Sequence, residues 1–317
     1  MSSEKLLGVD IGGTKIAVCL GTRDGEILDK IRFDTPEGWP AAVAAVGDAL
    51  KTLAGRSGGF GTVGGVGISC GGPLDAQGGR ILSPPNLPGW DDVPVTALLK
   101  ERTGLPVFLE NDANACALAE WYWGAGRGVD DLVFLTFGTG LGAGLILGGR
   151  LHRGVTGLAG EVGHIRLAES GPEGYGKAGS WEGFCSGGGI SRMYRTASGK
   201  TAEAREVFQA AREGEPEARL VVETSARQLG RGIALLVDIL NPRRIIIGSI
   251  FLRQEEVLRP LMEQEIFRES LAASAGDCLV VPAALGESLG DRAALGVAHW
   301  GLAETGAGGR PAGQGEA

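Results

Sequence analysis

Two segments of the chain share one uncommon pattern: a buried strand, a turn of glycine and threonine, and a second strand. In the first copy, residues 6–20 hold two apolar runs separated by a turn at residues 12–14. In the second copy, residues 132–147 hold two apolar runs around a turn at residues 138–140. Each hairpin leads into a third strand and then into helices. An internal duplication of this kind predicts two lobes of related α/β structure.

The length of the chain agrees with two lobes, because 317 residues of which 43% are hydrophobic can form two cores of ordinary size. We expect a small N-terminal lobe at residues 1–113, to which residues 291–302 return. A large lobe is expected at residues 114–290. Residues 303–317 are Gly, Ala, Pro and polar residues, and we expect them to form a disordered tail.

Charge and cysteine content exclude several classes of protein. A net charge of -8 disfavours a general surface for nucleic acid or for anionic membranes, since both need clustered Lys and Arg. The five cysteines are scattered without a CxxC pair, which is typical of a reducing compartment. The chain shows neither a signal-peptide pattern nor about 18 unbroken apolar residues. We therefore expect a soluble cytoplasmic protein without membrane or nucleic-acid partners.

The first turn has the groups that a phosphate site needs. Asp10 ends a strand, Gly12 and Gly13 offer backbone N–H groups, and Thr14 and Lys15 add a hydroxyl and an ammonium. The segment lacks P-loop spacing and leads into a strand rather than a helix. An ordinary hairpin turn would explain one such motif. The recurrence of glycine and threonine at Gly138, Thr139 and Gly140 favours phosphate binding by both turns.

Several acids are candidates for catalysis or binding, each with a structural alternative. Asp112 follows a predicted strand and opens a predicted helix, where Asp is also a favoured N-cap. Glu161 and His164 lie three residues apart after a glycine-rich stretch, and Glu182 follows in another. Such a pair usually has a structural role, with its hydrogen bonds made to neighbouring groups at the surface or in the core. Only three histidines occur, so a site of several histidines is not expected.

Four motifs in sequence order carry a family resemblance. They are DIGGTK at residues 10–15, ENDANA at 110–115, FGTGLG at 137–142 and GEVGH at 160–164. In this order they resemble the ROK (repressor, open reading frame, kinase) sugar kinases over about residues 5 to 300. The resemblance implies a duplicated actin-like ATPase fold, related to ribonuclease H, with two lobes and a cleft between them. It also implies ATP-dependent phosphorylation of a hexose or amino sugar and a homodimer.

The resemblance also implies roles for individual residues. Asp112 would be the general base that takes the proton from the attacking sugar hydroxyl, and Asp10 would help to place Mg²⁺, directly or through water. The implied sugar contacts are Gly72, Asn86, Asn111, Glu161, His164 and Glu182. The implied ATP contacts are Gly12, Gly13, Thr14, Lys15, Gly138, Thr139, Gly140, Gly187 and Gly248, the last two near adenine.

Two departures from the family pattern matter. Many relatives carry a CxCGxxGC zinc motif, but residues 173–180 here have Glu173, Tyr175 and Ser180 at the cysteine positions, so no structural zinc is expected. Packing by Tyr175, Trp181 and Phe184 is expected to hold this loop instead. Ser249 follows Gly248 where a second glycine is usual.

Glucose is the expected substrate, because the loop at residues 83–90 resembles that of the glucokinase members. The sequence leaves fructose, mannose, allose and N-acetylated hexosamines open, as well as the preferred phosphoryl donor. A transcriptional regulator of the same family is a lesser alternative, since only residues 1–5 precede the first hairpin where repressors carry a DNA-binding domain. A sugar sensor without catalysis is disfavoured because Asp10, Asp112 and both turns are present.

Overall fold

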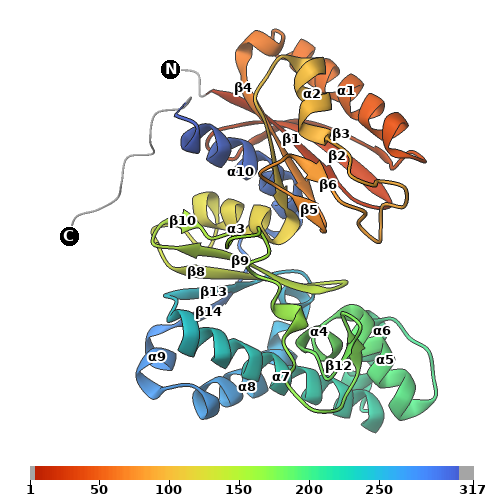
Figure 1. Cartoon of the computed structure of the whole chain (residues 1–317). Coiled ribbons are helices and arrows are strands. Elements are labelled where there is room, and N and C mark those ends of the chain that lie inside the picture. Colours follow the sequence, from red (N-terminus) through yellow and green to blue (C-terminus); the bar gives the residue numbers. More distant parts are fainter. Residues whose placement is uncertain (1–3, 307–317) are drawn as a thin grey trace. The chain divides into compact units, whose positions relative to one another are not determined.

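The computed structural model describes residues 4–306 of the chain. These residues form two compact units (Figure 1). The first contains the described residues up to Gly128 together with those from Leu285 onward. The second runs from Val129 to Ala284. Each unit has its own sheet and its own core.

The first unit is built on a five-stranded sheet of order β3-β2-β1-β4-β7. Its strands are β1 (Lys5–Ile11), β2 (Lys15–Thr22), β3 (Ile27–Asp34), β4 (Val63–Cys70) and β7 (Val107–Asn111). The meander β1-β2-β3 is antiparallel, whereas β4 and β7 join β1 in parallel. The other elements are α1 (Trp39–Arg56), α2 (Val95–Thr103), α3 (Asp112–Trp123), α10 (Leu289–Glu304), the short strands β5 (Leu74–Asp75) and β6 (Arg80–Ile81), and the 3₁₀ turns η1 (Phe60–Thr62) and η3 (Gly286–Ser288).

Alternation along β1 distributes its side chains between two cores. Leu7 and Val9 face the cluster that contains the apolar residues of α1. Leu6 faces the opposite way and packs with Leu295 of α10. Because successive side chains of a strand point to opposite faces, helices cover the sheet on both sides. This burial holds the ends of β1, β4 and β7 in fixed positions.

The second unit repeats this topology with a sheet of order β10-β9-β8-β13-β14. Its strands are β8 (Leu132–Phe137), β9 (Leu141–Leu147), β10 (Arg150–Leu151), β13 (Arg244–Ile247) and β14 (Leu279–Pro282). The meander is again antiparallel and the last two strands are parallel to β8. The duplicated α/β fold expected from the sequence is therefore confirmed.

Helices and short elements complete the second unit. They are η2 (Val162–His164), β11 (Glu173–Gly174), β12 (Lys177–Ala178), α4 (Trp181–Phe184), α5 (Gly187–Ser198), α6 (Ala204–Glu213), α7 (Pro216–Leu240), α8 (Ile250–Glu269) and α9 (Ala272–Asp277). Ile233 and Val237 of α7 and Phe251 of α8 belong to the same core as Val133 and Leu135 of β8. These two long helices thus cover one face of the sheet.

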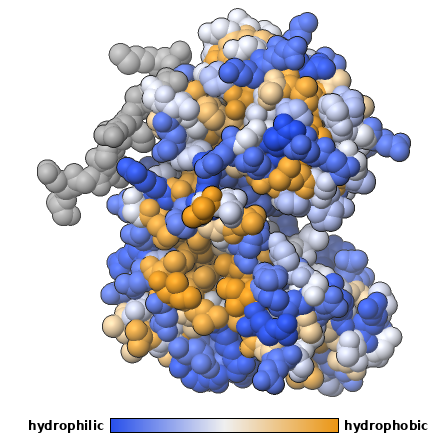
Figure 2. All heavy atoms as spheres, in the orientation of Figure 1, coloured by the Kyte–Doolittle hydropathy of each residue, from blue (hydrophilic) through white to orange (hydrophobic). Residues whose placement is uncertain are grey.

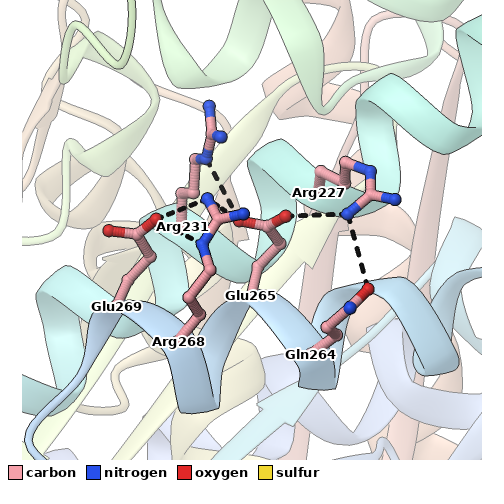
Figure 3. Close-up of polar contacts among 6 residues, drawn as sticks. All are labelled: Arg227, Arg231, Gln264, Glu265, Arg268 and Glu269. Carbon is pink, nitrogen blue, oxygen red and sulfur yellow. Dashed lines mark hydrogen bonds and ion pairs between the residues drawn. The ribbon is translucent and has the colours of Figure 1, made fainter.

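A buried carboxylate joins α7 to α8 (Figure 3). The side chain of Glu265 is 0% exposed and receives Arg227 at 2.9 Å and Arg231 at 3.3 Å, both from α7. Arg268, which lies in α8 like Glu265 itself, contacts the carboxylate at 2.6 Å. Burial by itself raises the pKa of Glu265, but the hydrogen bonds from Arg227 and Arg231 and the charge of Arg268 outweigh it and hold the pKa below its ordinary value.

The unit boundaries differ from those expected from the sequence. The first unit continues to Gly128 instead of ending at residue 113, because α3 packs against α10. Helix α10 ends at Glu304 and so includes the first two residues of the expected tail. Residues 307–317 of that tail lie outside the described residues.

The described surface has apolar and charged regions, and Figure 2 shows both kinds on one face. On the second unit, exposed large apolar residues include Leu220, Leu235 and Ile239 of α7, Phe267 of α8, Leu271 before α9 and Leu279 of β14. Among residues 4–306, no helix is both long and apolar enough to cross a membrane.

Candidate active site

Asp10 lies near the carboxyl end of β1, where a negative charge is disfavoured. Burial, followed by the negative charges of Asp112 and Asp291, raises the pKa of Asp10 to about 6. A hydrogen bond with Ser69 of β4 and the charge of Lys30 act in the opposite direction without cancelling the rise. A carboxyl held in this way is typical of a functional site, because a bound cation would stabilise its charged form.

The first turn of α10 approaches Asp10 closely. A Cβ atom at Gly290 would lie 3.2 Å from Asp10 Oδ2, so a side chain there would crowd the carboxylate. The same turn is held to β3 by an ion pair of 2.6 Å between Asp291 and Lys30. The sequence analysis did not identify Gly290, Asp291 or Lys30 as part of the site. No local sequence pattern indicates them, because β3, which contains Lys30, and α10, which contains Gly290 and Asp291, are separated by most of the chain.

The turn after β1 is fixed by its own backbone and by the loop that contains Asn86. The N–H of Gly12 donates to the carbonyl of Lys15 at 3.0 Å, and Thr35 donates its hydroxyl to the carbonyl of Gly12 at 2.6 Å. A Cβ atom at Gly13 would lie 2.3 Å from the backbone oxygen of Asn86, so only glycine fits there. The exposed side chains of the turn are those of Thr14 and Lys15.

Asn111, rather than Asp112, caps helix α3. The side-chain oxygen of Asn111 accepts the N–H of Ala113 at 2.9 Å, with the extended backbone of an N-cap residue. Asp112 is the first residue of the helix, and its Oδ1 also accepts the N–H of Ala113, at 2.8 Å. The interpretation of Asp112 as the N-cap is therefore wrong, because β7 continues to Asn111. Asp112 Oδ1 stabilises the start of the helix through this N–H, and its Oδ2 is directed toward the glycine pair that follows β4.

Three predicted residues of the first unit meet at the glycine pair that follows β4. A Cβ atom at Gly71 would lie 4.0 Å from Asp112 Oδ2 and 3.9 Å from Asn86 Nδ2. A Cβ atom at Gly72 would lie 3.4 Å from Asn111 Nδ2. The peptide bond from Gly72 to Pro73 is cis. The group thus combines a carboxylate, two amides and a closely approached backbone, all of which can bind hydroxyl groups.

In the second unit, the turn after β8 meets the start of two helices. The N–H of Gly138 donates to the carbonyl of Gly140, two residues further along, at 3.0 Å, whereas Gly12 in the first unit donates to the carbonyl three residues further along. The carbonyl of Gly138 accepts the N–H of Gly187, the first residue of α5, at 2.8 Å. A Cβ atom at Gly138 would lie 3.4 Å from the hydroxyl of Ser249, which precedes α8. Thr139, between Gly138 and Gly140, is exposed.

Gly248 has a packing role of its own. It is buried, and a Cβ atom there would lie 2.9 Å from Cζ of Phe134. The absence of a side chain is therefore required by the core. This close contact accounts for the glycine at position 248 independently of any nucleotide.

The three predicted sugar residues of the second unit are joined by contacts from one hairpin. Tyr175 donates its hydroxyl to Glu161 Oε2 and its backbone N–H to Glu182 Oε1, the latter at 3.2 Å. Lys177 Nζ lies 3.1 Å from His164 Nδ1 and donates to the carbonyl of His164 at 2.7 Å. Glu182 Oε2 accepts the N–H of the first residue of β9 at 3.1 Å. Of the aromatic residues expected to hold this loop, Trp181 and Phe184 are buried in the core, whereas Tyr175 is 50% exposed and adds an edge-on ring contact with His164 to its hydrogen bonds.

The described side chains could hold a metal ion only together with water or with oxygens of a bound phosphate. Among the described residues, no group of three or more His, Cys, Asp or Glu side chains is arranged to hold a metal ion. Mg²⁺ does not need such a group, because it usually takes one or two carboxylates and completes its shell with water and phosphate oxygens. The partly buried carboxyl of Asp10, with Asp112 nearby, fits that requirement.

Comparison with known proteins identifies the family. The model of the ROK family matches residues 6–303. The chain belongs to the ROK family. Among curated ROK proteins, the glucokinase of Thermotoga maritima is 34% identical over 308 residues, which is 92% of this chain and 96% of that protein. This confirms the family predicted from the four motifs.

Solved structures of ROK proteins agree with the fold. The ROK hexokinase from Thermus thermophilus has a TM-score of 0.83 at 33% identity, and the match covers 96% of this chain and 100% of that one. A ROK family glucokinase from Streptomyces griseus, solved in complex with glucose and AMPPNP, has a TM-score of 0.74 at 32% identity over 93% of this chain and 99% of its own. The actin-like ATPase fold is therefore confirmed.

Proposed function

We propose that this ROK protein is an ATP-dependent sugar kinase that converts glucose to glucose 6-phosphate, with Asp112 as the general base. The observation that carries the proposal is the convergence of Asp112, Asn111 and Asn86 on the glycine pair after β4. The naming of similar ROK proteins as glucokinase and hexokinase supports it. The sugar contacts proposed for the second unit are Glu161, His164 and Glu182.

The proposed reaction needs one proton acceptor and a way to hold phosphates. Asp112 accepts the proton of the attacking sugar hydroxyl while the new bond between that oxygen and the γ-phosphorus forms and the bond to ADP breaks. The exposed groups of the two turns, Thr14 and Lys15 in one and Thr139 in the other, bind phosphate oxygens. Asn86 and Asn111 orient the sugar by hydrogen bonds to its hydroxyls.

Asp10 is the proposed Mg²⁺ residue, directly or through water. A bound Mg²⁺ would supply positive charge against the phosphate oxygens during transfer. The chain's own contribution is to keep the Asp10 carboxyl beside Ser69 and against Gly290, where burial and two neighbouring acids disfavour its charged form and a cation would favour it. Gly187 and Gly248 remain the proposed neighbours of adenine.

The setting of the enzyme is also proposed. Free thiols at all five cysteines support a reducing compartment and hence the cytoplasm. The exposed apolar residues of α7 and α8 support a homodimer, because exposed apolar surface is often covered by association. Gel filtration with light scattering tests the dimer.

A sugar screen tests the function. ADP release is measured by a coupled assay with glucose, fructose, mannose, allose and N-acetylated hexosamines, each with ATP and Mg²⁺. We expect the largest kcat/KM with glucose. A larger value with an N-acetylated hexosamine would refute glucose as substrate but not the kinase. If no sugar increases ADP release, the kinase is refuted, and a gel-shift assay would then test a regulator.

A further inference from the structure

The hairpin β11-β12 makes polar contacts with both acids and with the histidine of the proposed sugar site. Its turn is formed by Tyr175 and Gly176, which have φ angles of 59° and 65°. Two positive φ angles in a two-residue turn match the twist of a tight hairpin, but glycine or asparagine is usual where Tyr175 stands. The two hydrogen bonds from Tyr175 to Glu161 and Glu182 hold it in this conformation.

The contact of Lys177 with His164 has a chemical consequence for the imidazole. A lysine ammonium has three donors and no acceptor, so at 3.1 Å it can only donate to Nδ1. An Nδ1 that accepts a hydrogen bond carries no proton. The neutral ring then carries its proton on Nε2, since the bond made by one ring nitrogen decides the state of the other.

The second contact of Lys177 fixes the direction of the ammonium. The carbonyl of His164 accepts from Nζ at 2.7 Å, so the lysine holds both the backbone and the ring of the same residue. His164 is exposed, whereas Lys177 is only partly exposed beside it. The ring is therefore oriented by the lysine and still accessible to a ligand.

We propose that Lys177 is a positioning residue that makes His164 a hydrogen-bond donor to the sugar, through Nε2–H. Tyr175 has the complementary part, because it orients the carboxylate of Glu161 as an acceptor. The pair then recognises one sugar hydroxyl by its oxygen and another by its hydrogen. This inference rests on the proposed function, because it assigns a role in sugar binding.

The tautomer of His164 can be measured without any sugar. Nitrogen-15 NMR of the histidine side chains distinguishes a proton on Nδ1 from one on Nε2, and only three histidines need assignment, by His152→Gln and His299→Gln. We expect Nε2–H for His164 in the unchanged protein, a mixture of tautomers in Lys177→Met, and recovery of Nε2–H in Lys177→Arg. Nδ1–H in the unchanged protein would overturn the proposal.

Kinetics give the second measurement. In Lys177→Met, we expect the sugar KM to rise about threefold to tenfold, the size of one hydrogen bond, while kcat stays within about twofold. Lys177→Arg should restore most of the loss. Lys200→Met is the matched control, since Lys200 pairs with Glu215 on the same unit and is 63% exposed. An unchanged KM in Lys177→Met, or an equal rise in both lysine variants, would overturn the proposal. Absence of turnover in the unchanged protein would refute the kinase instead and leave the NMR result standing.

Discussion

The two units have the same sheet, but acidic chemistry is concentrated at the strand ends of only one. In the first unit, Asp10 is the last residue but one of β1, and Asp112 follows β7. At the matching place of β8 stands Thr136, whose hydroxyl accepts the N–H of Gly142 within its own hairpin at 2.9 Å. Ala283 follows β14. Duplication thus preserved the strand order, while the acids that we propose for catalysis and Mg²⁺ lie in the first copy.

Asp10 and Glu265 extend the comparison, because both are acids in buried surroundings. The neighbours of Glu265 are three arginines, and its pKa is lowered. Asp10 has two acids near it, and its pKa is raised. A carboxylate whose charge is balanced stabilises its unit, whereas one left unbalanced favours a cation ligand.

The largest expected effect comes from Asp112→Asn. The amide keeps the size of the side chain but cannot accept the sugar proton, so kcat should fall about a hundredfold to ten-thousandfold while sugar affinity changes little. Steady-state assays and calorimetric titration with glucose measure the two quantities. Asp48→Asn, at an exposed position of α1, is the control and should retain full activity. A loss of less than tenfold would contradict the role of Asp112 as a base.

Asp10→Asn should stabilise the protein while it removes activity. Because the folded pKa of about 6 lies above the ordinary 3.8, the wild type loses stability as the pH rises from about 4 to about 6. The asparagine variant has no such loss, so above pH 6 its free energy of unfolding should be higher by up to about 3 kcal/mol. The difference should vanish below about pH 4. Urea unfolding at pH 4 and pH 8 checks it, and equal stability at pH 8 would contradict it.

Glu265→Gln should lower the free energy of unfolding, in contrast to the increase expected for Asp10→Asn. Because the pKa of Glu265 is lowered in the folded protein, its carboxylate stabilises the protein at pH values above the ordinary pKa of 4.5. This stabilisation is lost as the pH falls through the lower folded pKa. At pH 7 the variant should lose about 1–3 kcal/mol with kinase activity unchanged. The control is Glu269→Gln, whose side chain on the same helix is 43% exposed. Equal effects of the two variants would show that burial of the carboxylate is unimportant.

The smallest effect is expected from zinc chelation. Glu173, Tyr175 and Ser180 stand where many relatives carry cysteines, so thiolate ligands are missing from the hairpin. After EDTA treatment, activity should return fully when Mg²⁺ alone is added. Elemental analysis of the purified protein is the complementary measurement, and stoichiometric zinc would contradict the prediction.

Local patterns were sufficient for the regular elements and for much of the candidate site. The hairpins predicted at residues 6–20 and 132–147 are present in the structure as β1-β2 and β8-β9. Asn86, Asn111 and Asp112 were predicted together, and the structure brings them to one glycine pair. The family motifs, rather than spacing, assigned their roles. The end of the first unit was placed too early, because the packing of α3 on α10 joins distant segments.

The sequence by itself determined the duplicated hairpins, the family and the acid at position 112, because these depend on residues that are close along the chain. Only the tertiary structure decided that Asn111 caps α3 and that Lys30 holds Asp291 beside Asp10. It also decided that Lys177 donates to His164. Such contacts depend on how strands and loops fold back on each other. The electrostatic environment of each acid, set by burial and by partners from other elements, is therefore a property of the folded chain.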